Sequence, residues 1–104
     1  MQEICTYLSQ HYRTSHTLSE MAARAHMSIS HFSSEFKKYT GKTLVQYAND
    51  IRIEKAKELL QEPDIKIYDI ADLVGYSTIS YFNRVFKESV GISPSDFRRK
   101  VGLC

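Results

Sequence analysis

The sequence contains the same pattern twice, and this repeat limits what the chain can fold into. Residues 18–43 and 67–93 align at an offset of 49 up to residue 28 and at an offset of 50 from residue 30 onward. The second copy therefore has one extra residue at this point. After it, five aligned pairs are identical: Ser30/Ser80, Phe32/Phe82, Phe36/Phe86, Lys37/Lys87 and Gly41/Gly91. The chain is thus expected to fold as two similar units.

Each copy predicts a helix-turn-helix motif, because a short apolar helix and a tight turn precede a helix with one aromatic and one polar face. The 3.6-residue spacing of apolar side chains predicts seven helices. Their approximate bounds are 2–12, 18–25, 29–40, 44–61, 67–74, 78–89 and 94–101. The predicted fold class is all-α. Within one domain of residues 1–104, we expect two helix-turn-helix subdomains, 1–43 and 62–104, joined by a long central helix over 44–61.

Capping and turn residues support these boundaries. N-caps are expected at Thr17, Ser28 and Ser93, and left-handed C-caps at Gly41 and Gly91. The turn of each motif favours a residue with positive φ. Gly75 meets this requirement in the second motif, and His26 would have to meet it in the first at some cost.

The buried faces follow from the same periodicity. Ala22 and Ala71 are expected where the two helices of each motif cross closely. The predicted core of the first motif also includes Leu18 and Met21, with the stripe Ile29, Phe32, Phe36 and Tyr39. In the central helix the expected buried face is Leu44, Tyr47, Ala48, Ile51, Ala56, Leu59 and Leu60.

Removing the buried stripes leaves a polar face on each second helix, at positions i, i+3, i+4 and i+7. The two sets are Ser30, Ser33, Ser34 and Lys37, and Ser80, Asn83, Arg84 and Lys87. Such faces suit base edges in a DNA major groove, where Asn83 can pair with adenine and Arg84 with guanine. We predict base contacts for all of these residues except the lysines, which suit phosphate better. Further phosphate or flanking candidates are Ser28, His31, Lys38, Ser77, Thr78, Tyr81 and Arg98.

The two motifs are not equal as readers of sequence. Arg84 and Asn83 discriminate bases better than three serines do, so the second motif is expected to supply most of the selectivity. The first would contribute positioning, contacts by His31, or shape readout. The central helix, at about 27 Å, is somewhat shorter than the major-groove repeat of about 34 Å. Two adjacent major grooves are therefore the predicted binding site, with the DNA bent to close the gap between these two lengths.

The formal net charge is only +2, so charge alone is weak evidence for a nucleic-acid partner. The C-terminal region is basic, with Arg84, Lys87 and the run 98–100, whereas residues 62–72 are mainly acidic. This separation is expected if one face of the protein contacts phosphate and another does not. It is equally consistent with an ordinary solvated surface. The rival function is a helical protein-interaction module that docks transcription machinery without reading bases. Such a module would expose apolar side chains where these helices carry polar ones.

Other functional classes find little support. No nucleophile–base–acid constellation stands out, so an enzyme is not expected, and no cofactor or metal ligand set is recognisable. Cys5 and Cys104 lie at opposite ends of the sequence, which favours a reduced, cytoplasmic setting over a disulfide framework. No apolar run has membrane-spanning length. Double-stranded DNA is the predicted partner, and RNA polymerase is a candidate second one.

The sequence resembles the DNA-binding domain of the AraC/XylS family of bacterial transcription regulators. The resemblance lies in IRIEKAKELL (51–60), IYDIADLVGYSTISYFNRVFKESVGISPSDFRR (67–99) and the weaker first copy from residue 18. It implies two helix-turn-helix motifs on a long helix, forming the C-terminal part of a protein whose effector-sensing or dimerising region lies outside this chain. Matching positions imply base contacts by Ser30, Ser33, Ser34, Ile79, Ser80, Asn83 and Arg84. Periodicity, by contrast, assigns Ile79 to the core.

Overall fold

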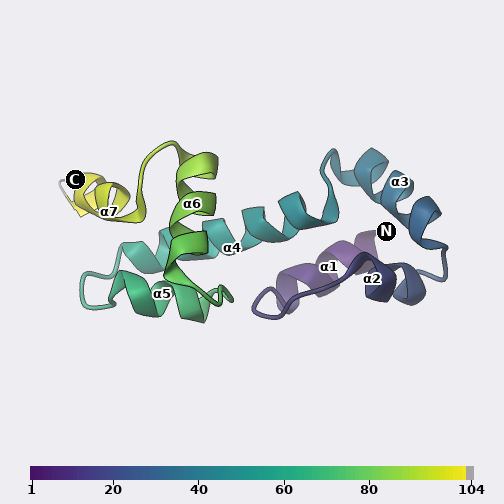
Figure 1. Cartoon of the computed structure of the whole chain (residues 1–104), viewed down its shortest axis with the longest axis horizontal. Helices are drawn as coiled ribbons and strands as arrows, with labels where there is room; N and C mark the ends of the chain where they lie inside the picture. The colour runs from purple at the N-terminus through teal and green to yellow at the C-terminus, as the bar shows by residue number, and fades with distance from the viewer. Residues whose placement is uncertain (103–104) are drawn as a thin grey trace. The chain divides into compact units, whose positions relative to one another are not determined.

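The computed structural model describes residues 1–102, and this part of the chain consists of seven helices and no strand (Figure 1). The helices are α1 (Gln2–Gln10), α2 (Leu18–Arg24), α3 (Ile29–Thr40), α4 (Leu44–Leu60), α5 (Ile67–Leu73), α6 (Ile79–Val90) and α7 (Pro94–Gly102). The all-α prediction is confirmed, and each boundary lies within two residues of its expected place. Cys104, for which no disulfide is expected, lies outside the described residues.

The chain divides into two compact units, Met1–Asn49 and Asp50–Cys104. The first contains α1, α2, α3 and the start of α4. The second contains the rest of α4 with α5, α6 and α7 (Figure 1). Each unit therefore holds one complete helix-turn-helix motif, and α4 belongs to both.

The core of the first unit is built around α3. Phe32 and Phe36 are fully buried, and their rings lie 5.5 Å apart. The Tyr47 ring of α4 meets Phe36 edge-on at 5.4 Å. The other large buried side chains of this unit are Ile4, Leu8, Met21 and Leu44.

Three residues predicted to be in this core are exposed instead: Leu18 at 38%, Ile29 at 50% and Tyr39 at 58%. Ile29 and Tyr39 lie at the two ends of α3, which packs against α2. The stripe predicted from periodicity is thus buried in the middle of α3 and exposed at both ends. Leu18 is the first residue of α2.

The core of the second unit is a chain of aromatic contacts. Phe82 lies 5.5 Å from the Tyr76 ring and 5.8 Å from Phe86, which in turn meets Phe97 of α7 at 5.6 Å. In α4, Ile53 is buried, whereas the predicted Ile51 is only half-buried. The buried positions 53, 56 and 60 follow the spacing i, i+3, i+7. The face predicted from Leu44 onward by helical periodicity passes through Ile51, so it does not include Ile53.

The predicted caps and turns are confirmed. The side-chain oxygens of Thr17, Ser28 and Ser93 accept hydrogen bonds from the backbone three residues on, at 3.1, 3.2 and 3.1 Å. Both predicted C-cap glycines have positive φ. The motif turns also behave as expected, because φ is 104° at Gly75 and 59° at His26. The first motif therefore has a left-handed turn residue without a glycine.

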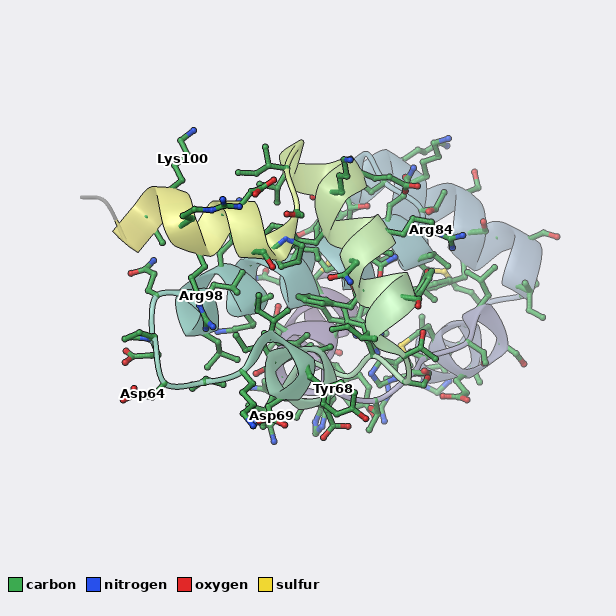
Figure 2. The ribbon with its side chains drawn as sticks, turned by 60° about the vertical axis from the view of Figure 1, so that its left-hand side comes forward. Asp64, Tyr68, Asp69, Arg84, Arg98 and Lys100 are labelled. Atoms are coloured by element: carbon green, nitrogen blue, oxygen red, sulfur yellow. The ribbon has the colours of Figure 1, made fainter. Side chains whose placement is uncertain are left out.

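Arg98 connects α7 to the end of α4. Its Nε donates to the Leu60 carbonyl at 3.0 Å and its Nη2 to the Glu62 carbonyl at 2.9 Å. Figure 2 shows Arg98 and Lys100 leaving α7 on opposite sides. The last carbonyls of a helix lack intrahelical partners and attract positive charge, so this guanidinium caps α4. Arg98, one of the predicted phosphate candidates, therefore already has two acceptors within the folded chain.

Replacing Arg98 should weaken the second unit. We expect Arg98→Ala to lower the free energy of unfolding by about 1–3 kcal/mol, because two charge-assisted hydrogen bonds between distant segments are lost. Arg99→Ala is the matched control. Arg99 pairs with the exposed Asp96 on the same helix, and such pairs contribute about 0–1 kcal/mol. Urea unfolding of the two variants measures the difference, and equal losses would contradict the capping role.

Candidate nucleic-acid interface

The predicted polar faces of α3 and α6 are exposed. On α3 the exposed residues are Ser30, Ser33, Ser34 and Lys37, and on α6 they are Ser80, Asn83, Arg84 and Lys87. Their outward direction follows from the opposite face of each helix, where two phenylalanines are buried at i and i+4. Each helix thus presents a complete polar set to solvent. The contacts of these residues with bases and phosphate stay predictions.

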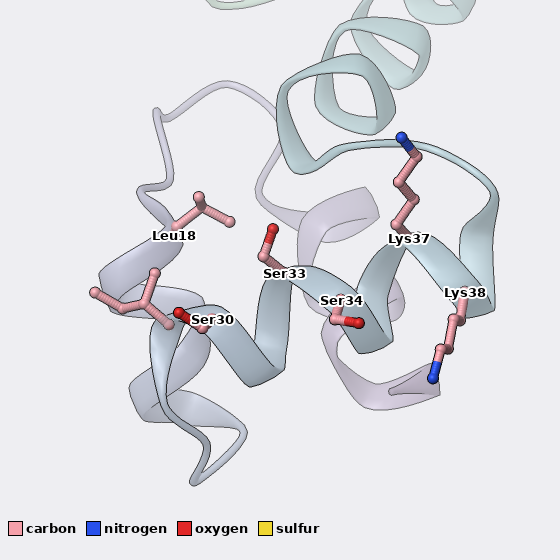
Figure 3. A pocket seen from close by; sticks show the side chains of 7 residues that line it. Leu18, Ser30, Ser33, Ser34, Lys37 and Lys38 are labelled. Atoms are coloured by element: carbon pink, nitrogen blue, oxygen red, sulfur yellow. The ribbon is translucent and has the colours of Figure 1, made fainter.

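The polar face of α3 forms a shallow hollow (Figure 3). Its lining consists of Leu18, Ile29, Ser30, Ser33, Ser34, Lys37 and Lys38. The serines are short, which leaves space above α3. Figure 3 shows Lys37 and Lys38 pointing away from each other at one end, with Leu18 at the other. The hollow therefore combines a small-residue floor, an apolar end and a basic end.

Several flanking candidates already have roles inside the motifs. Ser28 caps α3 by accepting the His31 backbone N–H, and Thr78 caps α6 by accepting that of Tyr81 at 3.2 Å. A hydroxyl that accepts in this way keeps its own hydrogen as a donor, so both can still donate to a phosphate oxygen. Ser77 is exposed beside the second of these caps.

The Glu35 carboxylate lies near two other side chains of α3. His31 Nε2 lies 3.8 Å from the Glu35 carboxylate, and Lys38 Nζ lies 3.6 Å from the same group. Both pairs are well exposed, so they are weak and screened. They orient His31 and Lys38 along the helix without removing either from solvent.

Arg84 of α6, the residue predicted to discriminate bases best, lies over one aromatic ring. Its Cζ lies 5.0 Å from the centre of the Tyr81 ring. Tyr81 in turn meets the buried Tyr76 edge-on, at 5.6 Å between centroids. Burial raises the pKa of Tyr76 to about 12, although the nearby Arg52 opposes this shift. The guanidinium of Arg84 is therefore linked, through one exposed and one buried neutral ring, to the core of the second unit.

Two acidic side chains of the second unit, Asp64 and Asp69, lie apart from Arg84. Figure 2 shows Asp64 and Asp69 along one edge of the view with Tyr68, while Arg84 and Lys100 lie toward the other. All three residues of this edge are exposed. The exposed acidic side chain of α6 itself is Glu88, one turn after Arg84.

A family model described as a helix-turn-helix domain matches residues 21–100 of the sequence. The chain belongs to the AraC/XylS family of helix-turn-helix domains. The AraC-type domain described here is 35% identical over 95 residues to the MmsAB operon regulatory protein of Pseudomonas aeruginosa, covering 91% of this chain and 31% of that protein. It spans about a third of the length of several curated relatives that it matches.

Solved structures show the same fold. The C-terminal domain of AraT, a response regulator from Geobacillus stearothermophilus, matches with a TM-score of 0.88 and 33% identity, over 95% of this chain and 83% of that one. The DNA-binding domain of AdpA, described as a global transcriptional factor and solved with a target DNA, matches with a TM-score of 0.88 and 25% identity. That likeness covers 95% of this AraC-type domain and 89% of the AdpA chain.

Two features of the AraC-type surface are not predicted from the sequence. Ile29 and Leu18 line the hollow and are not part of the core, and their places as first residues of α3 and α2 do not signal this, because Ile79 and Ile67 begin α6 and α5 and are partly buried. The stacking of Tyr81 with Arg84 is the second feature. Residues at i and i+3 are neighbours on a helix surface, so the spacing of this pair already allows the contact.

Tyr81 is expected to position Arg84 for base recognition. Tyr81→Leu should reduce discrimination at the base that Arg84 reads by about 0.5–1 kcal/mol, the typical strength of an exposed cation–π contact. Tyr81→Phe keeps the ring and should keep the discrimination. The measurement is the affinity ratio between a preferred site and one substituted at the position where Arg84→Ala loses selectivity. If the Phe variant loses as much as the Leu variant, the hydroxyl is the functional group and the positioning role is wrong.

Proposed function

We propose that this chain is the DNA-binding domain of a bacterial transcription regulator, which places α3 and α6 in adjacent major grooves of double-stranded DNA. The observation that carries the proposal is the presence of two helix-turn-helix motifs whose second helices both expose a full polar face. Family membership and the likeness to AdpA, solved with DNA, support it.

The roles within the proposed interface follow from side-chain chemistry. Arg84 and Asn83 are the residues able to form bidentate pairs with guanine and adenine, and Ser80 adds a single hydroxyl. Lys37, Lys38 and Lys87 suit phosphate. The two motifs flank α4, whose 17 residues span about 26 Å. That length supports neighbouring grooves as the binding site, since these repeat at about 34 Å.

Partners and location follow from the same proposal. A regulator of this kind acts on chromosomal DNA, in the bacterial cytoplasm at the nucleoid, and it has no catalytic role in this domain. Over residues 1–102, no helix is both long and apolar enough to cross a bilayer. Effector binding and dimerisation would be supplied by other parts of a longer protein. RNA polymerase would be the second partner if the regulator activates transcription.

Selection from random double-stranded DNA tests the proposed function. We expect a defined, asymmetric sequence to be enriched, with two recognition segments about one helical turn apart. Affinity for that sequence should fall steeply as the salt concentration rises, because lysine and arginine side chains that contact phosphates release counterions from the DNA. A protein-interaction module would enrich no sequence and show no such salt dependence, and this outcome would reject DNA binding.

The ranking of the two motifs has its own test. Arg84→Ala should lose about 1–3 kcal/mol of discrimination at one base pair, because a bidentate contact is removed. Ser34→Ala, at the aligned position of the first motif, should lose much less, since a serine makes one weak contact. Both variants are measured on a library in which each base pair of the selected site is substituted in turn. Equal losses of selectivity would contradict the ranking.

A further inference from the structure

The hollow on α3 exposes apolar side chains where a reader of hydrogen bonds would carry polar ones. Ile29 and Leu18 both line it, beside Ser30, Ser33 and Ser34. Ile29 is the first residue of α3 and is half exposed. A large β-branched side chain in this place gains little from folding. It would gain from burial against another apolar group.

The position of Ile29 indicates what that group is. In helix-turn-helix proteins, the N-terminal residues of the second helix contact base edges in the major groove. The four base pairs offer donors and acceptors there, and the one apolar group is the C5-methyl of thymine. The short serines leave the space that a methyl and its ring edge would need.

We propose that the first motif recognises thymine through its C5-methyl group, with Ile29 as the contacting residue. Leu18 closes the hollow beside it, and Lys37 and Lys38 at the basic end supply charge complementary to the flanking phosphates. The inference rests on the proposed function, and it assigns to the first motif a base preference that its serines alone do not provide.

The second motif differs at the corresponding position. Ile79, which aligns with Ile29, is less exposed than Ile29 and falls in the partly buried range. The exposed face of α6 carries Asn83 and Arg84 instead. The two motifs therefore divide the work, with apolar contact to thymine in one and hydrogen bonds to guanine or adenine in the other. This division predicts a thymine in the segment of the site that lies under α3.

Replacing thymine by deoxyuridine removes only the methyl group, so it isolates the proposed contact. Each thymine of the selected site is replaced singly, and affinity is measured with the unchanged chain. We expect one or two thymines in the α3 segment to lose about fourfold in affinity, the factor for one buried methyl-sized group. Thymines in the α6 segment serve as internal controls and should show smaller effects.

Protein variants then test whether Ile29 is the contact. In Ile29→Ala, the loss caused by deoxyuridine in the α3 segment should disappear, because the contacting side chain is gone. Val45→Ala is the matched control. Val45 is also an exposed aliphatic residue of the first unit, but it lies on α4 outside the hollow. Its variant should keep the full deoxyuridine effect. Circular dichroism is the control that both variants remain helical.

The outcomes separate this inference from the proposed function. A selected site without thymine in the α3 segment overturns the inference alone, as does binding that deoxyuridine does not change. A deoxyuridine effect that persists unchanged in Ile29→Ala overturns the role of Ile29. Failure to select any sequence rejects DNA binding, and the inference with it. Loss of the effect in Ile29→Ala but not in Val45→Ala supports the inference.

Discussion

Two phenylalanines at i and i+4 in each second helix fix the rotation of that helix about its axis. Phe32 and Phe36 in α3, and Phe82 and Phe86 in α6, are all essentially inaccessible to solvent. A helix has one degree of rotational freedom when it packs, and a pair of large rings on one stripe removes it. The polar residues at the remaining positions then have only one direction available, away from the core.

This common constraint allows the two motifs to differ in chemistry without differing in fold. Because the rings and caps hold the helix, the exposed positions are free to vary. On α6 one exposed position is Arg84, whose guanidinium lies over the Tyr81 ring. α3 instead carries serines and an exposed isoleucine, which together make a hollow. The repeat therefore preserves the frame and two polar positions, Ser30/Ser80 and Lys37/Lys87, whereas Ser33/Asn83 and Ser34/Arg84 differ.

Local sequence signals predicted most of the fold. Helix bounds, the Ser28 and Ser93 caps and the positive φ of His26 depend on residues within one or two turns, so they can be read from short patterns. The exposure of Ile29 cannot be read in this way, because the aligned Ile79 is the same residue type at the start of its helix and is nevertheless partly buried. The exposed polar residues of α3 and α6 can also be predicted from local patterns, because they follow from helical periodicity within two turns. The apolar part of the hollow was missed because periodicity alone assigns every large aliphatic residue to the core.

The basic run Arg98-Arg99-Lys100 shows why counting cations overstates affinity for phosphate. Arg98 donates to carbonyls of residues 60 and 62, and Arg99 pairs with Asp96 on its own helix. Moving Arg98 to a phosphate would break two hydrogen bonds that stabilise the folded chain, so the net gain is smaller than its charge suggests. The exposed Arg99–Asp96 pair is weak and costs less to break. The sequence separation of Arg98 from its acceptors is what conceals this from a reading of local charge.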